Sequence, residues 1–264
     1  MPETYTHGHH ESVLRSHRWR SAANSCAYVL DRLGPGTDLL DVGCGPGTIT
    51  ADLARHVAPG RVVGLDRSAE VLAAARRDAG GLGTLEYREG DAYALPVEDA
   101  SFDAVHAHQV LQHLSDPVSA LREMRRACRP GGVVAARDGD YASMAWHPAD
   151  PLLDRWLDLY RRAAQANGGE PDAGRHLLGW AQAAGFSEVV PSASVWCHAT
   201  PEERDWWGGL WADRITASAL AEQLRAQGLA SVDELAAIAA AWRRWAAAHD
   251  GWFTVVHGEV LCRP

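Results

Sequence analysis

Hydrophobic residues in the first half of the chain fall into two alternating patterns. Short apolar runs, which are typical of buried strands, predict strands at residues 38–42, 61–65, 85–87, 102–107 and 133–136. Between these runs apolar residues recur every three or four positions, as in the stripe of Ile49, Leu53 and Val57, which is the spacing of a helix with one buried face. Strands separated by such helices form βαβ units, whose right-handed crossovers build a parallel sheet covered on both faces.

The rest of the chain is predicted to be mostly helical. Ahead of the first strand, helical spacing continues from Trp19 to Leu33. In the second half, helices are predicted at residues 152–166, 176–184, 202–211, 215–227 and 232–248. Two more strands, 188–196 and 252–261, flank the last three helices; if they pair at the sheet edge, residues 199–250 form a helical insertion that covers the sheet as a lid. The predicted organisation is a helical cap (1–36), a sheet domain (37–198 and 251–264) and the lid (199–250).

Composition and charge narrow the class of protein. The 264 residues include 47% hydrophobic and 22% charged residues, which suits a folded, soluble protein. The net charge of −9 argues against binding to nucleic acid. No apolar stretch approaches the roughly 18 residues that span a bilayer, and the N-terminal segment lacks the apolar core of an export signal. We therefore expect a cytoplasmic protein without a membrane partner; whether it is a monomer or a homodimer stays open.

The cysteines and the N-terminal histidines do not predict a metal site. The five cysteines are odd in number and widely spaced, without a CxxC pair, which fits reduced thiols better than a disulfide framework or a zinc site. His7, His9 and His10 form a cluster in a segment that is otherwise polar, where a solvated terminus is the simpler interpretation. We expect no bound metal.

The string LLDVGCGPGT at residues 39–48 carries the most chemical information. An apolar strand passes into a glycine loop and directly into a helix, so bare backbone can approach a ligand at the helix N-terminus. A dinucleotide site would have the pattern GxGxxG, but this loop is GxGxG, with Thr48 where the third glycine would stand and Asp41 before the loop. The spacing weakens the case for a pyrophosphate ligand.

Carboxylates follow the next two strands. Asp66 ends the second strand, where a carboxylate can accept hydrogen bonds from both ribose hydroxyls. Asp91 follows the third strand, where it can accept from an exocyclic amine. Helix capping or turn formation explains each of these residues singly. Together with Asp41 they describe a ligand with a ribose, an adenine and a cation but no phosphate.

At these residues the chain resembles the class I S-adenosylmethionine (SAM) dependent methyltransferases, and among them the ubiquinone- and menaquinone-biosynthesis type. The matching segments, in the family's order over about residues 37–138, are LLDVGCGPGTIT, VVGLD, EGDAYALP, SFDAVHAHQVLQHLSDP and LREMRRACRPGGVV. The resemblance implies a doubly wound, Rossmann-like α/β fold with a seven-stranded, mostly parallel sheet whose C-terminal strand is antiparallel. It also implies SAM as the cofactor.

The resemblance assigns a cofactor site residue by residue. The glycine loop would face the methionine part of SAM, and Asp41 would support the loop and the amino group. Asp66 would hold the ribose with Arg67 beside the adenine, while Asp91 would read the adenine edge. In related enzymes the N-terminal segment folds over the cofactor, where an arginine can pair with the SAM carboxylate, although a solvated helix face is the alternative. The predicted cofactor-binding residues are Arg18, Asp41, Gly43, Cys44, Gly45, Gly47, Asp66, Arg67, Asp91, Ala92 and His108.

Methyl transfer from a sulfonium requires alignment of the acceptor behind the methyl group and exclusion of water. An acceptor that is protonated at neutral pH also needs a base, for which histidine is well suited. His108 and His113, at the carboxyl end of the fourth strand, are therefore predicted to be catalytic, with Asp138 after the fifth strand as the next candidate. A structural role at a helix start is the alternative for His113. His106 alternates with His108 and is expected to point to the other face.

Aromatic residues gather in the half that would cover the acceptor. Ten of the eleven tryptophans lie after residue 140. Aromatic stripes at helical spacing more often form a core than a pocket, yet this excess is compatible with an apolar or planar small molecule. The predicted acceptor contacts are Tyr5, His9, Tyr141, Trp146, Trp207 and Trp211.

The predicted function is methyl transfer from SAM to O, N or C of a small organic acceptor. The alternative is a SAM-binding protein that does not methylate and uses the cofactor as a structural or electrostatic aid to another reaction, or as a regulatory ligand. The sequence leaves both open because fold and cofactor pocket do not fix the chemistry.

Overall fold

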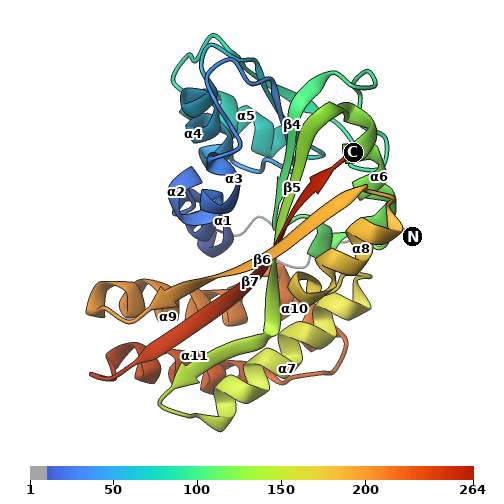
Figure 1. The fold of residues 1–264 in the computed structure, drawn as a ribbon. Helices are drawn as coiled ribbons and strands as arrows, with labels where there is room; N and C mark the ends of the chain where they lie inside the picture. The colour runs from blue at the N-terminus through green and yellow to red at the C-terminus, as the bar shows by residue number, and fades with distance from the viewer. Residues whose placement is uncertain (1–10) are drawn as a thin grey trace.

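The protein is built on a seven-stranded sheet, described here for residues 11–264 by a computed structural model (Figure 1). The strands lie in the order β3-β2-β1-β4-β5-β7-β6. Their bounds are β1 (Leu39–Val42), β2 (Val62–Asp66), β3 (Leu85–Glu89), β4 (Phe102–His108), β5 (Cys128–His147), β6 (Glu188–His198) and β7 (Trp252–Arg263). β1 to β5 pair in parallel, whereas β7 runs antiparallel to both β5 and β6. The predicted fold class is confirmed, and so is the pairing of the last two strands at the sheet edge.

Helices cover both faces of the sheet, as its apolar strands require. The flanking helices are α2 (Ala22–Ser25), α3 (Ala27–Leu30), α4 (Thr48–Val57), α5 (Ala69–Asp78), α6 (Pro117–Ala127) and α8 (Leu177–Ala183). Successive strand residues face opposite sides. Leu39 belongs to the core cluster that contains Leu53 of α4, and Leu40 belongs to the cluster that contains Leu121 of α6.

The N-terminal segment is divided into α1 (Glu11–Arg18), α2 and α3, so the continuous helical run predicted ahead of the first strand is wrong. Helix α2 starts only after Ser21, whose hydroxyl accepts a hydrogen bond from the Asn24 amide at 3.3 Å while the Asn24 side chain accepts from the Ser21 amide at 2.8 Å. This reciprocal cap starts α2 afresh. A second break falls at Cys26, whose φ of −127° and ψ of 10° separate α2 from α3. Cys26, a free thiol like the other four cysteines, and Val29 still pack into the core, which is why the apolar spacing looked continuous.

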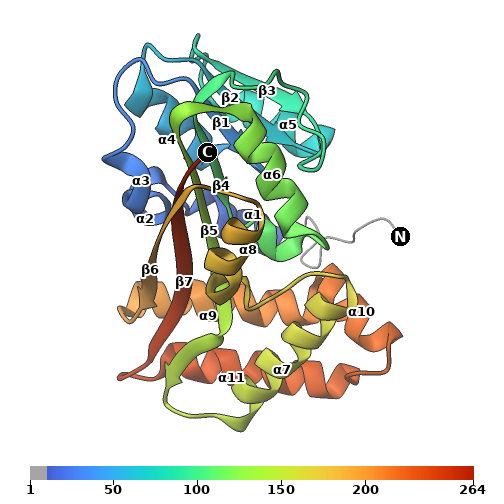
Figure 2. The same ribbon diagram turned by 45° about the vertical axis from the view of Figure 1, so that its right-hand side comes forward.

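A second layer of helices lies below the sheet in Figures 1 and 2. It consists of α7 (Pro151–Ala166), α9 (Pro201–Ala217), α10 (Ala219–Ala226) and α11 (Val232–Ala247). In its core the Trp156 ring lies 4.6 Å from Trp211 and 4.8 Å from Trp242, centroid to centroid. The predicted lid supplies α9 to α11, and α7, from outside it, packs into the same core; the domain boundaries themselves stay a prediction. Among residues 11–264, no helix has the length and apolarity that crossing a bilayer requires.

Long strands connect the sheet with this helical layer. β5 pairs with β4 as far as Arg137 and then continues with β7 to His147, and Figures 1 and 2 show β5, β6 and β7 reaching the helices. The β5–β7 register shifts between Asp140 and Ala145. The unpaired residues between these two positions form a bulge, a feature that bends a strand and redirects its side chains.

Two side chains near the start of α8 hold this bulge in place. The Arg175 guanidinium donates to both carboxylate oxygens of Asp140, at 2.7 and 2.6 Å, and to the Ser143 hydroxyl at 3.1 Å. Asp172 accepts from the Ala142 amide at 2.9 Å. Burial alone would raise the pKa of Asp140, but Arg175 and the Ser143 hydroxyl together outweigh it, and this pKa lies below the ordinary value.

Replacing Arg175 with Gln should lower the free energy of unfolding by about 1–2 kcal/mol, because a buried carboxylate loses its charged donors while the half-exposed arginine limits the effect. Since the folded pKa of Asp140 is depressed, this stabilisation is present above the pKa of a free aspartate, about 3.9, and is lost as the pH falls through the folded pKa. Urea denaturation at neutral and acidic pH measures both. Arg243→Gln, which removes an exposed 3.8 Å contact to Asp213, is the control; an equal loss in both variants would contradict the role of the Asp140 pair.

Candidate active site

A cavity of about 960 Å³ opens at the carboxyl edge of the sheet. Its walls come from the loops after β1 to β4, from α1 and α9, from the β5 bulge, and from β6 and β7. Its volume lies at the upper end of the range of about 300–1,000 Å³ for small-molecule sites. The cavity therefore has room for a cofactor and a second small molecule, at the edge where ligands of open α/β sheets collect.

The glycine loop after β1 presents bare backbone to this cavity. Gly43, Gly45 and Gly47 have left-handed φ values of +68°, +54° and +79°. A Cβ at Gly43 would lie 2.4 Å from a Val110 methyl carbon, and one at Gly47 would lie 2.3 Å from the Tyr87 hydroxyl. At Gly45 the nearest atom is 4.0 Å away. Packing thus requires glycine at the two ends of the loop, and the middle is open to a ligand.

Asp41, the residue two positions before Gly43, links the start of the glycine loop to neighbouring buried side chains. Its two carboxylate oxygens contact the Thr50 hydroxyl at 2.6 Å and His106 Nδ1 at 2.7 Å, and His106 Nε2 lies 3.3 Å from Cys26 Sγ. Burial favours a neutral imidazole, but Cys26 and Asp41 outweigh it and raise the pKa of His106 to about 10. His106 is not among the cavity-lining residues. The contact of Asp41 with an amino group stays a prediction.

Asp66 and Asp91 line the cavity at the next two strand ends. Asp66 accepts from the Gly45 amide at 3.0 Å and from the Ser68 amide at 2.9 Å, and Asp91 accepts from the Tyr93 amide at 2.9 Å. A carboxylate has about four lone-pair sites, so both side chains retain acceptors for ribose or adenine. The other predicted cofactor residues that line the cavity are Asp41, Gly43, Cys44, Gly45, Arg67, Ala92 and His108.

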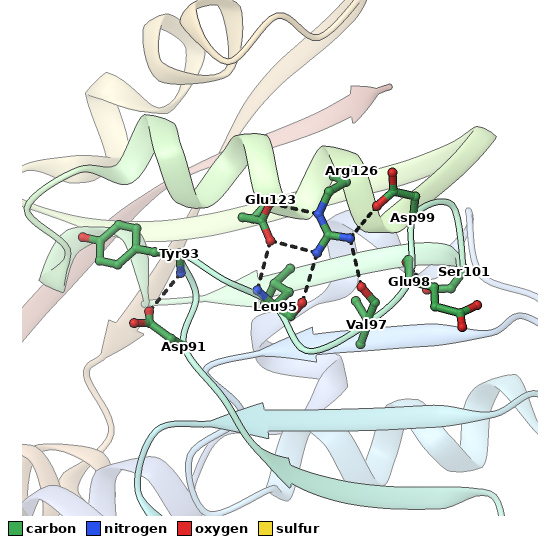
Figure 3. Close-up of polar contacts among 9 residues, drawn as sticks. All are labelled: Asp91, Tyr93, Leu95, Val97, Glu98, Asp99, Ser101, Glu123 and Arg126. Atoms are coloured by element: carbon green, nitrogen blue, oxygen red, sulfur yellow. Dashed lines mark hydrogen bonds and ion pairs between the residues drawn. The ribbon is translucent and has the colours of Figure 1, made fainter.

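One arginine of α6 clamps the loop that follows Asp91 (Figure 3). Arg126 donates to the main-chain oxygens of Leu95 and Val97, at 3.0 and 2.9 Å. Glu123 pairs with Arg126 at 2.8 Å and accepts from the Leu95 amide at 3.0 Å. The loop is therefore held to α6 by charge-assisted hydrogen bonds, which are stronger than neutral ones.

The end of α1 lies over the glycine loop. The Thr48 hydroxyl, at the start of α4, donates to the His17 main-chain oxygen at 3.2 Å. His17, Trp19 and Arg20 all line the cavity. The N-terminal segment thus covers the glycine loop, and the Arg20 guanidinium carbon lies 5.7 Å from the centroid of the Trp196 ring in the cavity wall.

Some predicted residues do not reach the cavity. Those outside its lining are Arg18, Gly47, Asp138 and Trp146. Arg18 is exposed at the end of α1, and Trp146 packs on Phe253 with ring centroids 5.8 Å apart, in the core of the helical layer. Tyr5 and His9 lie outside the described residues.

His108 ends β4 inside the cavity wall. Its ring is buried, and neither nitrogen has a hydrogen-bond partner among residues 11–264. The ring lies 5.9 Å from Trp196 and 6.3 Å from His257, centroid to centroid. Burial, and then the charge of Arg20, hold the pKa of His108 well below its usual value. Buried polar groups are normally hydrogen-bonded, so this neutral imidazole keeps hydrogen-bonding capacity that the described residues do not use.

His113 lines the cavity from the short helix η1 (Leu111–His113), and its Nε2 lies 3.1 Å from Gln112 Nε2. Asp138 lies behind this turn. Its Oδ1 accepts from the Gln112 amide at 3.1 Å, and its Oδ2 has no hydrogen-bond partner within the part of the chain that the structure describes. Burial raises the pKa of Asp138 to about 7. Asp138 can therefore act on the cavity through η1 rather than by contact with its contents.

The part of the cavity that faces α9 has aromatic walls, formed by Trp19, Tyr141, Trp196, Trp206, Trp207 and Trp211. Trp196 is held firmly, because its indole N–H donates to the Asn24 main-chain oxygen at 2.7 Å and its ring packs 4.3 Å from His257 and 4.8 Å from the Arg137 guanidinium. Tyr141, Trp207 and Trp211 belong to the predicted acceptor contacts.

Trp19, Trp196 and Arg214 are cavity residues that the sequence interpretation missed. A signal for Arg214 exists in the sequence. It lies three and seven residues after Trp211 and Trp207, which is one face of a helix. The prediction ended that helix at Trp211, whereas α9 continues to Ala217.

Comparisons with known proteins agree with the resemblance seen in the sequence. Residues 40–136 match a family described as "Methyltransferase domain". An uncharacterized methyltransferase of Schizosaccharomyces pombe is 34% identical over 267 residues, covering 97% of this chain and 95% of that protein. The demethylmenaquinone methyltransferase of Lactococcus lactis is 34% identical over 139 residues, covering 51% and 53%. The fold is similar to that of phosphoethanolamine N-methyltransferase 2 of Haemonchus contortus in complex with SAM, with a TM-score of 0.54 and 18% identity over 90% of this chain and 52% of that one.

Arg126→Gln should loosen the loop after β3 without unfolding the protein. Loss of the charged donors removes about 1–3 kcal/mol of local stability, so amide hydrogen exchange at Leu95 and Val97 should become roughly ten- to a hundredfold faster. Arg88→Gln, which removes an exposed pair with Glu86, is the matched control on β3. Unchanged exchange in the Arg126 variant would contradict the clamp.

Proposed function

This chain belongs to the SAM-dependent methyltransferases, and we propose that it transfers the methyl group of SAM to a small organic acceptor in the aromatic half of the cavity. The observation that supports this most directly is that one cavity joins two different ends. The glycine loop and the strand-end carboxylates lie at one end. The tryptophan walls lie at the other, together with His108, whose nitrogens have no hydrogen-bond partner among the described residues.

The residues present fit SAM. Gly45 leaves open space in front of the loop, Asp66 and Asp91 keep acceptor sites for ribose and adenine, and Arg20 can pair with a carboxylate. When bound, SAM supplies a methyl group already activated on a sulfonium, so the protein needs to contribute position and charge rather than a covalent intermediate.

The protein's part in the reaction is to align the acceptor and exclude water. α1 and α9 meet at one side of the cavity, where the described residues include an ion pair and a hydrogen bond between them. Arg15 pairs with Asp213 at 3.1 Å, and Arg214 donates to the Ser16 hydroxyl at 3.1 Å. Such closure strengthens electrostatic interactions inside the site. The contacts must open to admit the acceptor, so release of product can limit turnover.

We assign His108 to the reacting group of the acceptor, because it lines the cavity and neither of its ring nitrogens has a hydrogen-bond partner among the described residues. His113 is the second candidate from the same cavity wall, and Asp138 is a positioning residue behind it. Tyr141, Trp207 and Trp211 form the acceptor walls. A small molecule fits this enclosed space better than a nucleic acid, whose binding the acidic net charge of −9 opposes. A cytoplasmic location and a homodimer stay predictions.

Methyl transfer is favoured over the non-methylating alternative by the family of this chain. Incubation with SAM and candidate acceptors should give S-adenosylhomocysteine together with a product heavier by one CH₂ unit. Product change without S-adenosylhomocysteine would favour the alternative.

Asp66→Ala should weaken the binding of S-adenosylhomocysteine roughly ten- to a hundredfold, because each hydrogen bond to a charged carboxylate contributes about 1.5–3 kcal/mol. Calorimetric titration measures the affinity, and thermal unfolding checks that the fold is retained. Asp78→Ala removes the same charge from the exposed end of α5 and should leave the affinity unchanged. Equal affinities of all three proteins would refute the ribose contact.

His108→Phe should lower kcat/KM by about ten- to a hundredfold while the affinity for S-adenosylhomocysteine changes little, because the lost hydrogen bond goes to the acceptor. Since the pKa of His108 is depressed, its imidazole stays neutral as the pH falls from 8 to 6.5, and its protonation should add no acidic limb to the rate profile over that range. His249→Phe, at an exposed position, is the control. A parallel loss of cofactor affinity would show that His108 instead supports the cofactor.

A further inference from the structure

Gln112, in the middle of η1, is held through its backbone and its side chain alike. Its amide N–H donates to Asp138 Oδ1 at 3.1 Å, and its main-chain oxygen accepts from the Glu170 amide at 2.9 Å. The side-chain oxygen Oε1 accepts from the Gly139 amide at 3.1 Å. The residue is 3% exposed. The Gln112 side chain is therefore fixed in one orientation between η1 and β5.

The Gly139 contact decides which way round the Gln112 amide lies. A backbone N–H can only donate, so the atom that faces Gly139 must be the side-chain carbonyl oxygen. The NH₂ group then points to His113, whose Nε2 lies 3.1 Å from Gln112 Nε2. An amide NH₂ group donates and does not accept. The His113 nitrogen that it meets must therefore be the acceptor.

This contact determines which nitrogen of His113 carries the ring proton. A neutral imidazole has one N–H and one bare nitrogen. Because Nε2 of His113 accepts from Gln112, the proton lies on Nδ1, whatever group Nδ1–H meets. A proton that arrived at Nε2 would bring two donors face to face. His113 cannot take up a proton without breaking its contact with Gln112.

We propose that Gln112 is a positioning residue that keeps the ring proton of His113 on Nδ1, so that His113 serves methyl transfer as a hydrogen-bond donor and not as a base. The inference rests on the proposed function and assigns a role within it. His113 lines the cavity. A donor at this wall can hold a lone pair of the acceptor in the orientation that transfer requires.

The two candidate histidines then have different roles. His108 lines the same cavity, and neither of its ring nitrogens has a hydrogen-bond partner among residues 11–264. The bare nitrogen of His113 is engaged by Gln112, whereas that of His108 meets no donor of the described chain. A proton that the acceptor releases as the methyl group replaces it can therefore pass to His108 but not to His113.

Nuclear magnetic resonance of the protein with nitrogen-15 in its histidines tests the position of the proton. The protein is loaded with S-adenosylhomocysteine and measured at about pH 8, above the ordinary histidine pKa of about 6.5. The signals that disappear in His113→Asn identify His113. We expect a protonated Nδ1 and a bare Nε2. A proton on Nε2 of the unaltered protein would overturn the proposal.

Gln112→Glu tests whether residue 112 sets the position of the proton. A carboxylate still accepts from Gly139 but cannot donate to His113, so His113 Nε2 should become protonated. Gln109→Glu is the matched control, because Gln109 also lines the cavity but its Nε2 lies 2.8 Å from Nε2 of His257. An unchanged His113 in a folded Gln112→Glu protein, or the same change in both variants, would contradict the proposal. If Gln112→Glu does not fold, the spectrum of the unaltered protein still decides which nitrogen carries the proton.

Two replacements of His113 distinguish a donor from a base. The NH₂ group of asparagine can take the place of Nδ1–H and donate there, but neither asparagine nor alanine can act as a base. His113→Ala should lower kcat/KM about tenfold, measured with an acceptor that gives product in the incubation with SAM. His113→Asn should recover most of this loss. Equal losses in the two variants would refute the donor role.

The tests separate this inference from the proposed function. Calorimetry first measures the affinity of the unaltered protein for S-adenosylhomocysteine. A protein that does not bind this compound refutes the proposed function. A protein that binds it but carries the His113 proton on Nε2 refutes the role of Gln112 alone.

Discussion

The cavity exists because β5 and β7 continue past the edge at which the neighbouring strands end. β1 ends at Val42 and β4 at His108, but β5 and β7 remain paired as far as His147. The helical layer is attached to this extension. A hydrogen-bonded strand pair, and not a linker, therefore sets its position relative to the sheet. The bulge of β5 between Asp140 and Ala145 places Tyr141 and Met144 in the cavity wall. The ion pair between Asp140 and Arg175 holds the bulge in this conformation.

The N-terminal segment ties the two ends of the cavity together. Below the cofactor loop, Cys26 contacts His106, which in turn holds Asp41. Two residues earlier, the main-chain oxygen of Asn24 accepts from Trp196 in the acceptor wall. Buried polar groups of this kind contribute little net stability when paired but are costly to break, so they fix positions more than they stabilise the fold. A small shift of α2 would move the loop and the wall at once.

The sequence predicted the features that depend on local periodicity. Apolar runs located every strand, and because parallel strands end on one edge, Asp66 and Asp91 could be placed beside the glycine loop without a structure. Features that depend on distant partners were out of reach. The true length of β5 is hidden because polar residues such as Arg137 and Asp140 interrupt its apolar pattern, and they are tolerated in the buried strand by Glu259 and Arg175, far along the chain. The acceptor wall likewise unites segments that no local pattern relates.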